Sequence, residues 1–135
     1  MLEARTITVS IACPFDRAYA ATWPPESFPR WASGLSSSLH REGDAWVAET
    51  PAGKATITFS EKNAYGVLDH RVRLPGLPEI YIPLRMIANG DGTDVVFTLF
   101  RQPGMDDAAF ASDQAHVEKD LAALKALLEG QASTA

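Results

Sequence analysis

The sequence predicts an α+β fold in which a curved seven-stranded antiparallel sheet wraps around a long C-terminal helix. Two short helices are expected between the first and second strands. Three observations predict this fold. The first residues alternate in polarity, turn sequences recur through the middle of the chain, and the hydrophobic period becomes helical near the C-terminus.

The first strand and the short helices are predicted from the N-terminal quarter. Residues 5–13, RTITVSIAC, alternate between small polar and hydrophobic side chains, as a half-buried strand does. Pro14 ends this strand and suits a helix start, with Phe15 and Tyr19 at helical spacing. Residues 24–34 carry three prolines and a glycine, so they have room only for a short helical turn or a structured loop.

The middle of the chain predicts a meander of six strands. Turn sequences rich in glycine, proline, asparagine and aspartate recur between residues 42 and 93. They separate runs of strand length, which predicts consecutive antiparallel strands joined by short hairpins. The six expected strands are residues 36–42, 45–50, 54–60, 66–74, 79–88 and 93–102.

The C-terminal segment predicts one long helix. Hydrophobic residues recur there at intervals of three and four, Asp106 offers an N-cap and Gly130 a natural end. The helix should therefore have about 24 residues, a length of roughly 36 Å at 1.5 Å per residue. We expect one domain over residues 1–130, and a disordered tail over residues 131–135.

Composition excludes several classes of function. The charge of −5, from 12 basic and 17 acidic residues without a basic run, gives no support for a nucleic-acid partner. No run reaches the roughly 18 apolar residues of a membrane span. A single cysteine, Cys13, and an N-terminus unlike a signal peptide favour a cytoplasmic location. Without paired cysteines, metal-binding histidine spacing or a phosphate loop, we expect no cofactor and no metal.

Two segments resemble a known superfamily. They are ITVSIACPFDRAYAATWPPESFPRWASGL at residues 7–35, and GDGTDVVFTLFRQPG at residues 90–104, which leads into DLAALKALLEG. Their order and the overall pattern resemble the START-like, or SRPBCC, helix-grip superfamily, which includes pollen allergens, polyketide cyclases and lipid-transfer domains. The resemblance implies a cavity for a hydrophobic or amphipathic small molecule. It implies no particular chemistry.

Residues on the inner faces of the expected strands and helix should line that cavity. In the run YGVLDHRVRLPG, residues 65–76, His70 shares the hydrophobic face with Leu68 and Val72, whereas Asp69 points to the opposite face. The candidate lining residues are Trp31, Trp46, Ile57, Phe59, Leu68, His70, Val72, Ile82, Leu84, Met86, Phe97, Leu99, Arg101, Phe110, Val117 and Leu121.

Two interpretations of His70 are open. As a polar group in an apolar pocket, its imidazole could orient a ligand or transfer a proton. Alternatively, a backbone carbonyl satisfies it and its role is structural. Arg101 is similarly either an inward polar group or a side chain that reaches solvent.

Other polar residues are expected outside the cavity. Tyr81 and Arg85 should lie on the outer face of the sheet, unless a bulge at Pro83 exchanges the two faces. His40 and His116 are expected on polar faces and need no function.

Three functions remain open. The leading one is a binding protein for a hydrophobic or aromatic ligand, lipid-like or polyketide-like. The alternative is an enzyme of the cyclase, dehydratase or isomerase kind, with His70 as the candidate catalytic acid or base, although no catalytic motif is present. The third is an interaction module with a filled core. The protein could be a monomer or a homodimer, and binding leads because Arg101 is the other inward polar candidate and is a poor proton shuttle.

Overall fold

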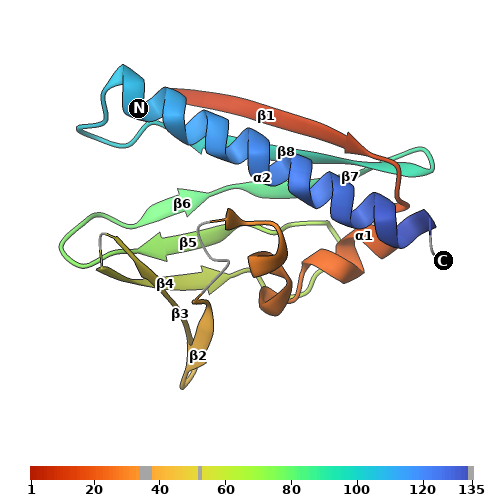
Figure 1. Ribbon diagram of the computed structural model, residues 1–135, viewed down its shortest axis with the longest axis horizontal. Helices are drawn as coiled ribbons and strands as arrows, with labels where there is room; N and C mark the ends of the chain where they lie inside the picture. Colours follow the sequence, from red (N-terminus) through yellow and green to blue (C-terminus); the bar gives the residue numbers. More distant parts are fainter. Residues whose placement is uncertain (34–37, 52, 134–135) are drawn as a thin grey trace.

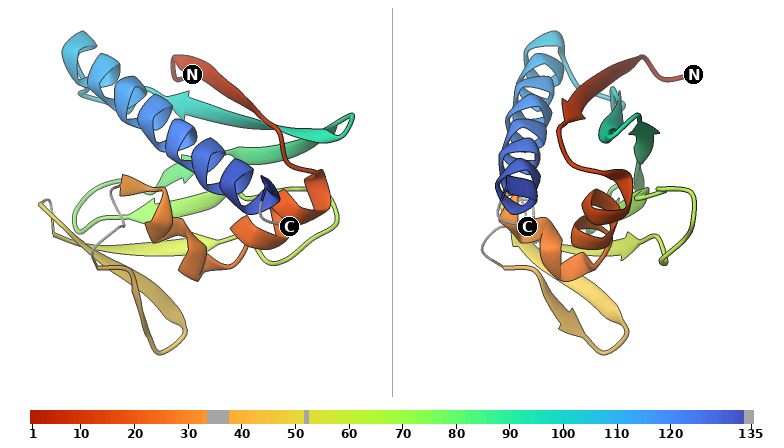
Figure 2. Two further views of the ribbon diagram at one scale, coloured as in Figure 1. Left: turned by 45° about the vertical axis from the view of Figure 1, so that its right-hand side comes forward. Right: turned by 90° about the vertical axis from the view of Figure 1, so that its right-hand side faces the viewer.

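The computed structural model of the protein describes residues 1–33, 38–51 and 53–133. The strands lie side by side, and the two longer helices lie on one face of them (Figures 1 and 2). The elements are β1 (Ala4–Ile11), α1 (Phe15–Thr22), the 3-10 helix η1 (Pro25–Arg30), β2 (His40–Glu42), β3 (Ala45–Thr50), β4 (Gly53–Phe59), β5 (His70–Arg73), β6 (Ile80–Ile82), β7 (Leu84–Asn89), β8 (Gly92–Phe100) and α2 (Asp107–Ser133).

The strands form two antiparallel sheets that meet at one seam. The orders are β1-β8-β7 and β2-β3-β4-β5-β6. The predicted strand 79–88 is divided at Pro83 into β6, which pairs with β5, and β7, which pairs with β8. Proline has no N–H to donate to a ladder, which explains the break. The predicted α+β helix-grip fold is confirmed, with this one strand counted as two.

Single contacts connect the sheets across this seam, where β6 gives way to β7. Thr98 N donates to Pro83 O over 3.1 Å, and Leu68 N donates to Leu84 O over 2.8 Å. An isolated bridge joins Val67 to Arg85. The seven predicted strands therefore follow one another in space without a gap, although the ladder is divided.

The two faces are not exchanged at Pro83. Ile80 and Ile82 are half-buried and Leu84 is buried, all on the inner face, while Tyr81 lies on the other face. The prediction of an outward Tyr81 and Arg85 therefore applies, and the bulge alternative is not observed.

Other predicted strands are shorter than expected. Strand 36–42 contributes β2 from His40 onward, and residues 36–37 lie outside the described part of the chain. Strand 66–74 is regular only from His70 to Arg73. Gly66, just before it, packs so closely on β7 that an added Cβ would lie 2.2 Å from Met86 O. This approach and its positive φ of 70° require glycine there.

Helix α2 begins at the predicted N-cap. Asp106 Oδ1 accepts a hydrogen bond from Ala109 N at 2.8 Å. The helix has 27 residues and continues past Gly130, the predicted end, through Ser133. Residues 134–135 of the expected tail lie outside the described residues.

The main core lies between the C-terminal half of α2, the short helices and β1, β7 and β8. Leu121, Leu124 and Leu128 of α2 are each about 1% exposed, and Phe28 of η1 is similarly buried. They pack in one cluster with Ile11, Cys13, Ala18, Tyr19, Trp31, Leu68, Leu84, Met86 and Val95. In the described chain, no helix is long and apolar enough to cross a membrane.

Candidate functional site

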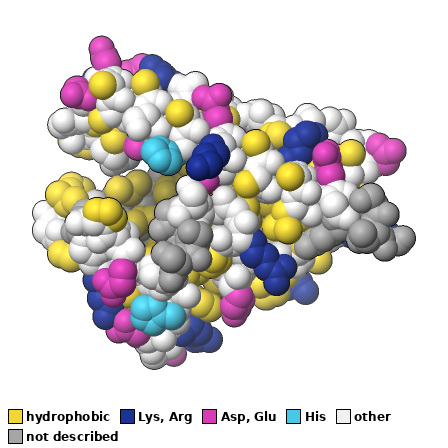
Figure 3. Space-filling view, viewed as in Figure 1, with side chains coloured by type: hydrophobic (Ala, Val, Ile, Leu, Met, Phe, Trp, Pro, Cys, Tyr) yellow, Lys and Arg dark blue, Asp and Glu magenta, His cyan; other side chains and the backbone are white. Residues whose placement is uncertain are grey.

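A deep hollow separates the N-terminal half of α2 from β5 and β6. Figure 3 shows it with hydrophobic side chains at its base. It has two adjoining compartments, an outer one of about 320 Å³ and an inner one of about 210 Å³. Both are bounded by Val72, Ile82, Phe97, His116 and Val117. The two compartments are therefore adjacent and share these walls.

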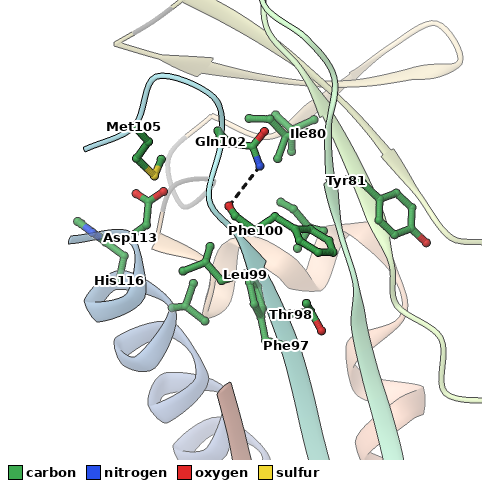
Figure 4. A pocket seen from close by; sticks show the side chains of 13 residues that line it. Ile80, Tyr81, Phe97, Thr98, Leu99, Phe100, Gln102, Met105, Asp113 and His116 are labelled. Atoms are coloured by element: carbon green, nitrogen blue, oxygen red, sulfur yellow. Dashed lines mark hydrogen bonds between the residues drawn. The ribbon is translucent and has the colours of Figure 1, made fainter. Parts of the chain in front are cut away.

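The outer compartment lies beside the first turns of α2. Figure 4 shows Asp113 and His116 of α2 on one side and Leu99 and Phe97 of β8 facing them. His116 Nδ1 lies 2.9 Å from Ser112 O, one turn earlier in the helix. The remaining residues of its wall are Ile80, Tyr81, Thr98, Phe100, Gln102 and Met105. The wall is thus mainly hydrophobic with polar groups on the helix side.

The inner compartment lies deeper, between α2, η1 and the sheet. Its own walls are Trp31, Ala32, Ile57, His70, Asp120 and Leu121. Asp120 Oδ1 accepts a hydrogen bond from Ser33 N at 3.2 Å, which ties the segment after η1 to α2. This contact connects the η1 side of the inner compartment to α2.

His70 is the buried polar residue of the inner compartment. It is 8% exposed, and its ring packs against Phe28 at 5.5 Å and Phe59 at 5.8 Å between centroids. Nδ1 lies 3.1 Å from Leu68 O. A carbonyl oxygen only accepts, so Nδ1 carries the hydrogen in the neutral ring and Nε2 is left as an acceptor. Among the described residues Nε2 has no hydrogen-bond partner.

The imidazole of His70 favours its neutral form. Burial lowers its pKa below the ordinary value of 6.5, because desolvation penalises the charged ring. The Leu68 carbonyl and the charge of Asp69 act in the opposite direction without reversing this shift. At neutral pH, His70 thus presents an unprotonated nitrogen.

Trp31 supplies a second unpaired polar group. Trp31 is 6% exposed, and its indole Nε1 is buried without a hydrogen-bond partner. Leaving a buried donor unpaired costs about 1–3 kcal/mol. Two residues of the inner wall, His70 and Trp31, thus each carry a ring nitrogen without a partner among the described residues, and the Trp31 nitrogen is itself buried.

Nine of the sixteen predicted lining residues border the two compartments. Four others are buried instead: Leu68, Leu84, Met86 and Phe110 are each no more than 4% exposed. Leu68, Leu84 and Met86 lie on the predicted inner face, but α1, η1 and the later turns of α2 cover that part of the sheet, whereas Phe110 lies on the first turn of α2 beside Arg5 and Arg101. The nine are Trp31, Ile57, His70, Val72, Ile82, Phe97, Leu99, Val117 and Leu121.

Phe59 and Trp46 lie behind the cavity wall rather than on it. Phe59 packs against Phe28, with ring centroids 4.7 Å apart. Trp46 meets Phe59 edge-on at 6.2 Å and packs in a smaller cluster with Ala48 and Ala55. Both support the wall that carries His70.

Arg101 points away from the cavity, as its alternative interpretation required. Its Nη1 lies 2.7 Å from Asp107 Oδ1 and 3.3 Å from Glu3 Oε1. Its Nε donates to Met105 O at 3.0 Å, and its guanidinium lies 5.7 Å from the Phe110 ring. Arg101 therefore anchors the start of α2 to the N-terminal strand.

His116 was expected on a polar face of α2, yet it borders the cavity, and so do Asp113 and Asp120. These three residues lie next to Val117 and Leu121 on the helix surface. Adjacent helical residues are about 100° apart, so the edge of a hydrophobic stripe carries its polar neighbours. Their spacing of three and four residues was the available signal.

Asp69 forms a separate cluster on the outer side of the seam. It is 6% exposed and accepts from Leu84 N at 2.9 Å and from Arg85 Nη2 at 3.0 Å. Tyr81 Oη also donates to it. Burial raises the pKa of Asp69, but the bonds from Arg85, Tyr81 and Leu84 outweigh burial and lower it overall. Asp69 thus binds β5 to both halves of the divided strand.

Positive charge is missing from the walls that the structure describes. No lysine or arginine lines either compartment in the described ranges, whereas Asp113 and Asp120 do. Across the same residues, no group of three or more His, Cys, Asp or Glu side chains is placed to hold a metal ion.

Comparison with known proteins identifies the fold. No family profile and no curated protein matches the sequence. An uncharacterised protein from Bacillus thuringiensis superposes with a TM-score of 0.73 at 15% identity, covering 93% of this chain and 98% of its own. The aromatase/cyclase Zhui from Streptomyces sp. R1128 gives 0.64 at 17% identity, with coverage of 98% and 94%.

A third similar structure comes from a longer protein. DynU16, from the dynemicin biosynthetic locus, gives a TM-score of 0.68 at 20% identity over 93% of this chain. This chain spans only 47% of DynU16. At these identities the likeness establishes architecture and not activity. The chain therefore has the helix-grip fold that its sequence resemblance implied.

Proposed function

We propose that the protein binds a small hydrophobic or aromatic molecule in the hollow between α2 and the sheet. One observation carries this proposal: two adjacent, mainly apolar compartments, the inner one lined by a buried histidine whose Nε2 has no partner among the described residues. Ligand sites are typically concave and apolar with a few polar groups that fix orientation. His70 is the group that would orient the ligand.

The comparisons support a ligand of this kind without naming it. Among the similar structures is the aromatase/cyclase Zhui, and another, DynU16, belongs to a biosynthetic locus. A lipid-like ligand is a second possibility within the same proposal, since the cavity wall is largely apolar.

Narrowing the shared wall tests the binding proposal. The neutral fluorescent probe N-phenyl-1-naphthylamine should bind the wild-type protein, and Val117→Phe should weaken binding at least about tenfold, because Val117 borders both compartments. Ala123→Phe, at an exposed position six residues further along the helix, is the control and should bind normally. Absence of binding, or equal binding by Val117→Phe, would contradict the proposal.

Proton transfer is a second candidate function, and one observation favours it. Asp120 and His116 border the inner compartment together with His70. A base needs a partner that can return the proton, and such groups lie on the opposite wall. In a cyclase, dehydratase or isomerase, His70 Nε2 would take a proton from a carbon next to a carbonyl, leaving an enolate.

Deuterium exchange distinguishes catalysis from binding alone. With 2-tetralone in D₂O, proton removal and return of a deuteron would exchange the α-hydrogens, which NMR detects. Acceleration by the wild type that His70→Gln abolishes would support catalysis. An exchange rate equal to that of buffer would leave binding as the function.

The filled-core alternative fits the described residues less well. Large side chains such as Met86 and Phe110 are buried, but Phe97 forms part of a wall beside open volume. Whether the protein is a monomer or a homodimer stays a prediction.

A further inference from the structure

The polarity of His70 restricts which chemical group can bind beside it. Nδ1 is committed to the Leu68 carbonyl, so Nε2 in the neutral ring can only accept a hydrogen bond. A ligand with only acceptors, such as a ketone or an ether, leaves Nε2 unpaired. A ligand that carries an O–H or N–H satisfies it, so the inner compartment favours a donor.

The charge of the walls restricts the ligand further. Asp113 borders the outer compartment, Asp120 the inner one, and no described lysine or arginine borders either. The nearby cations are engaged elsewhere: Arg5 with Gln114 at 2.5 Å, and Arg101 with Asp107 at 2.7 Å. A carboxylate in this hollow would lose its hydration without gaining a cation, which disfavours anionic ligands such as ionised fatty acids.

Trp31 adds a preference among donors. Trp31 borders the same compartment as His70, and its unpaired indole N–H is buried behind that wall. A hydroxyl group can donate one hydrogen bond and accept others, whereas a ring N–H only donates. The Trp31 nitrogen is closed to solvent in this arrangement, so His70 carries the inference and Trp31 supplements it.

We infer that the site selects a neutral ring bearing a hydroxyl group, a phenol or an enol, which donates its hydrogen to His70 Nε2. This inference rests on the proposed binding function. It identifies His70 as the residue that determines specificity, and it excludes ligands whose polar end is a carboxylate.

Four naphthalenes of nearly equal size test it: 2-naphthol, 2-methoxynaphthalene, naphthalene and 2-naphthoate. Calorimetry at pH 7.5 should show 2-naphthol binding about tenfold or more tightly than 2-methoxynaphthalene, with 2-naphthoate weakest. In His70→Leu the preference for 2-naphthol over its methyl ether should fall to nearly one. The exposed histidine variant His40→Gln is the matched control and should keep the wild-type preference.

The possible outcomes distinguish failure of this inference from failure of the proposed binding function. Equal binding of 2-naphthol and its methyl ether by the wild type, tighter binding of 2-naphthoate, or an unchanged preference in His70→Leu would overturn the inference while binding itself stands. Failure of all four to bind would overturn both. The wild-type comparison needs no variant, so the test holds even if His70→Leu does not fold.

Discussion

The two halves of helix α2 meet the sheet in different ways. Along the C-terminal half, Leu124 and Leu128 are closed off from solvent by close packing. Along the N-terminal half, Val117 and its polar neighbour His116 border open volume instead. One continuous helix thus serves as core at one end and as cavity wall at the other.

The short helices account for this difference. Helix α1 contacts β7, β8 and α2, so it fills the space between sheet and helix at the closed end. Phe28 of η1 extends that filling as far as the ring of His70, 5.5 Å away. At the open end, α2 and the sheet face each other across the hollow in Figure 4. Ligand space in this fold therefore depends on where the short helices stop.

Matched leucine truncations should show the largest contrast between the two halves. Leu124→Ala should cost about 3–4 kcal/mol of unfolding free energy, because it opens a new cavity in packed core. Leu99→Ala, on the cavity wall, should cost only about 1 kcal/mol, because its side chain already borders empty space. Urea unfolding measures both values. Equal costs would mean that the open end is packed as tightly as the closed one.

Sequence patterns predicted the architecture well because each element carries its own periodicity. The alternation of residues 5–13 and the change to helical spacing near Asp106 needed no information from elsewhere in the chain. The division of strand 79–88 at Pro83 was less accessible. Proline marks an interruption, but which neighbour each half then pairs with depends on the assembled sheet.

The site was predicted only in part because face and location are different properties. Strand alternation placed Leu68 and His70 on one face correctly, but it does not say which of them a short helix will cover. Helical spacing likewise assigned His116 to a polar face of α2. In the structure His116 lies at the edge of the hydrophobic stripe and borders the cavity. The buried Asp69 was expected to point outward, and its burial depends on Tyr81 and Arg85 from another strand.

Asp69 connects the start of β5 to β6 and β7, and its removal should have the next largest effect on stability. Asp69→Ala should cost about 2–3 kcal/mol, because Leu84 N–H loses its acceptor in a buried position and Arg85 loses its partner. Arg73→Ala, which removes an exposed ion pair with Glu79, is the control and should change stability by no more than about 0.5 kcal/mol. Urea unfolding compares the two variants.

The Asp69 result also tests the seam itself. If Asp69 were only an exposed residue of the outer face, Asp69→Ala would change the unfolding free energy as little as Arg73→Ala does. Faster amide hydrogen exchange at β6 and β7 in Asp69→Ala would locate the lost stability at Pro83, as the contacts predict.

The smallest effect should come from the pH dependence of His70, a single group at the open end. Its pKa in the folded protein lies below 6.5, chiefly because of burial, whereas the unfolded chain titrates near that ordinary value. Below pH 6.5 the unfolded state therefore binds more protons, and stability falls as the pH falls toward the lower, folded pKa. Above pH 6.5 the group contributes no pH dependence.

Comparing wild type with His70→Gln between pH 7.5 and pH 5.5 isolates this contribution. Urea unfolding should show that the variant loses less stability on acidification than the wild type does. His40, whose pKa is raised by the Ser38 carbonyl and Glu42, has the opposite sign but is present in both proteins and cancels. Asp69, Asp120 and His116 near the site are likewise common to both. Identical pH profiles would mean that His70 takes up its proton as easily when folded as when unfolded, and that the open end lets water reach it.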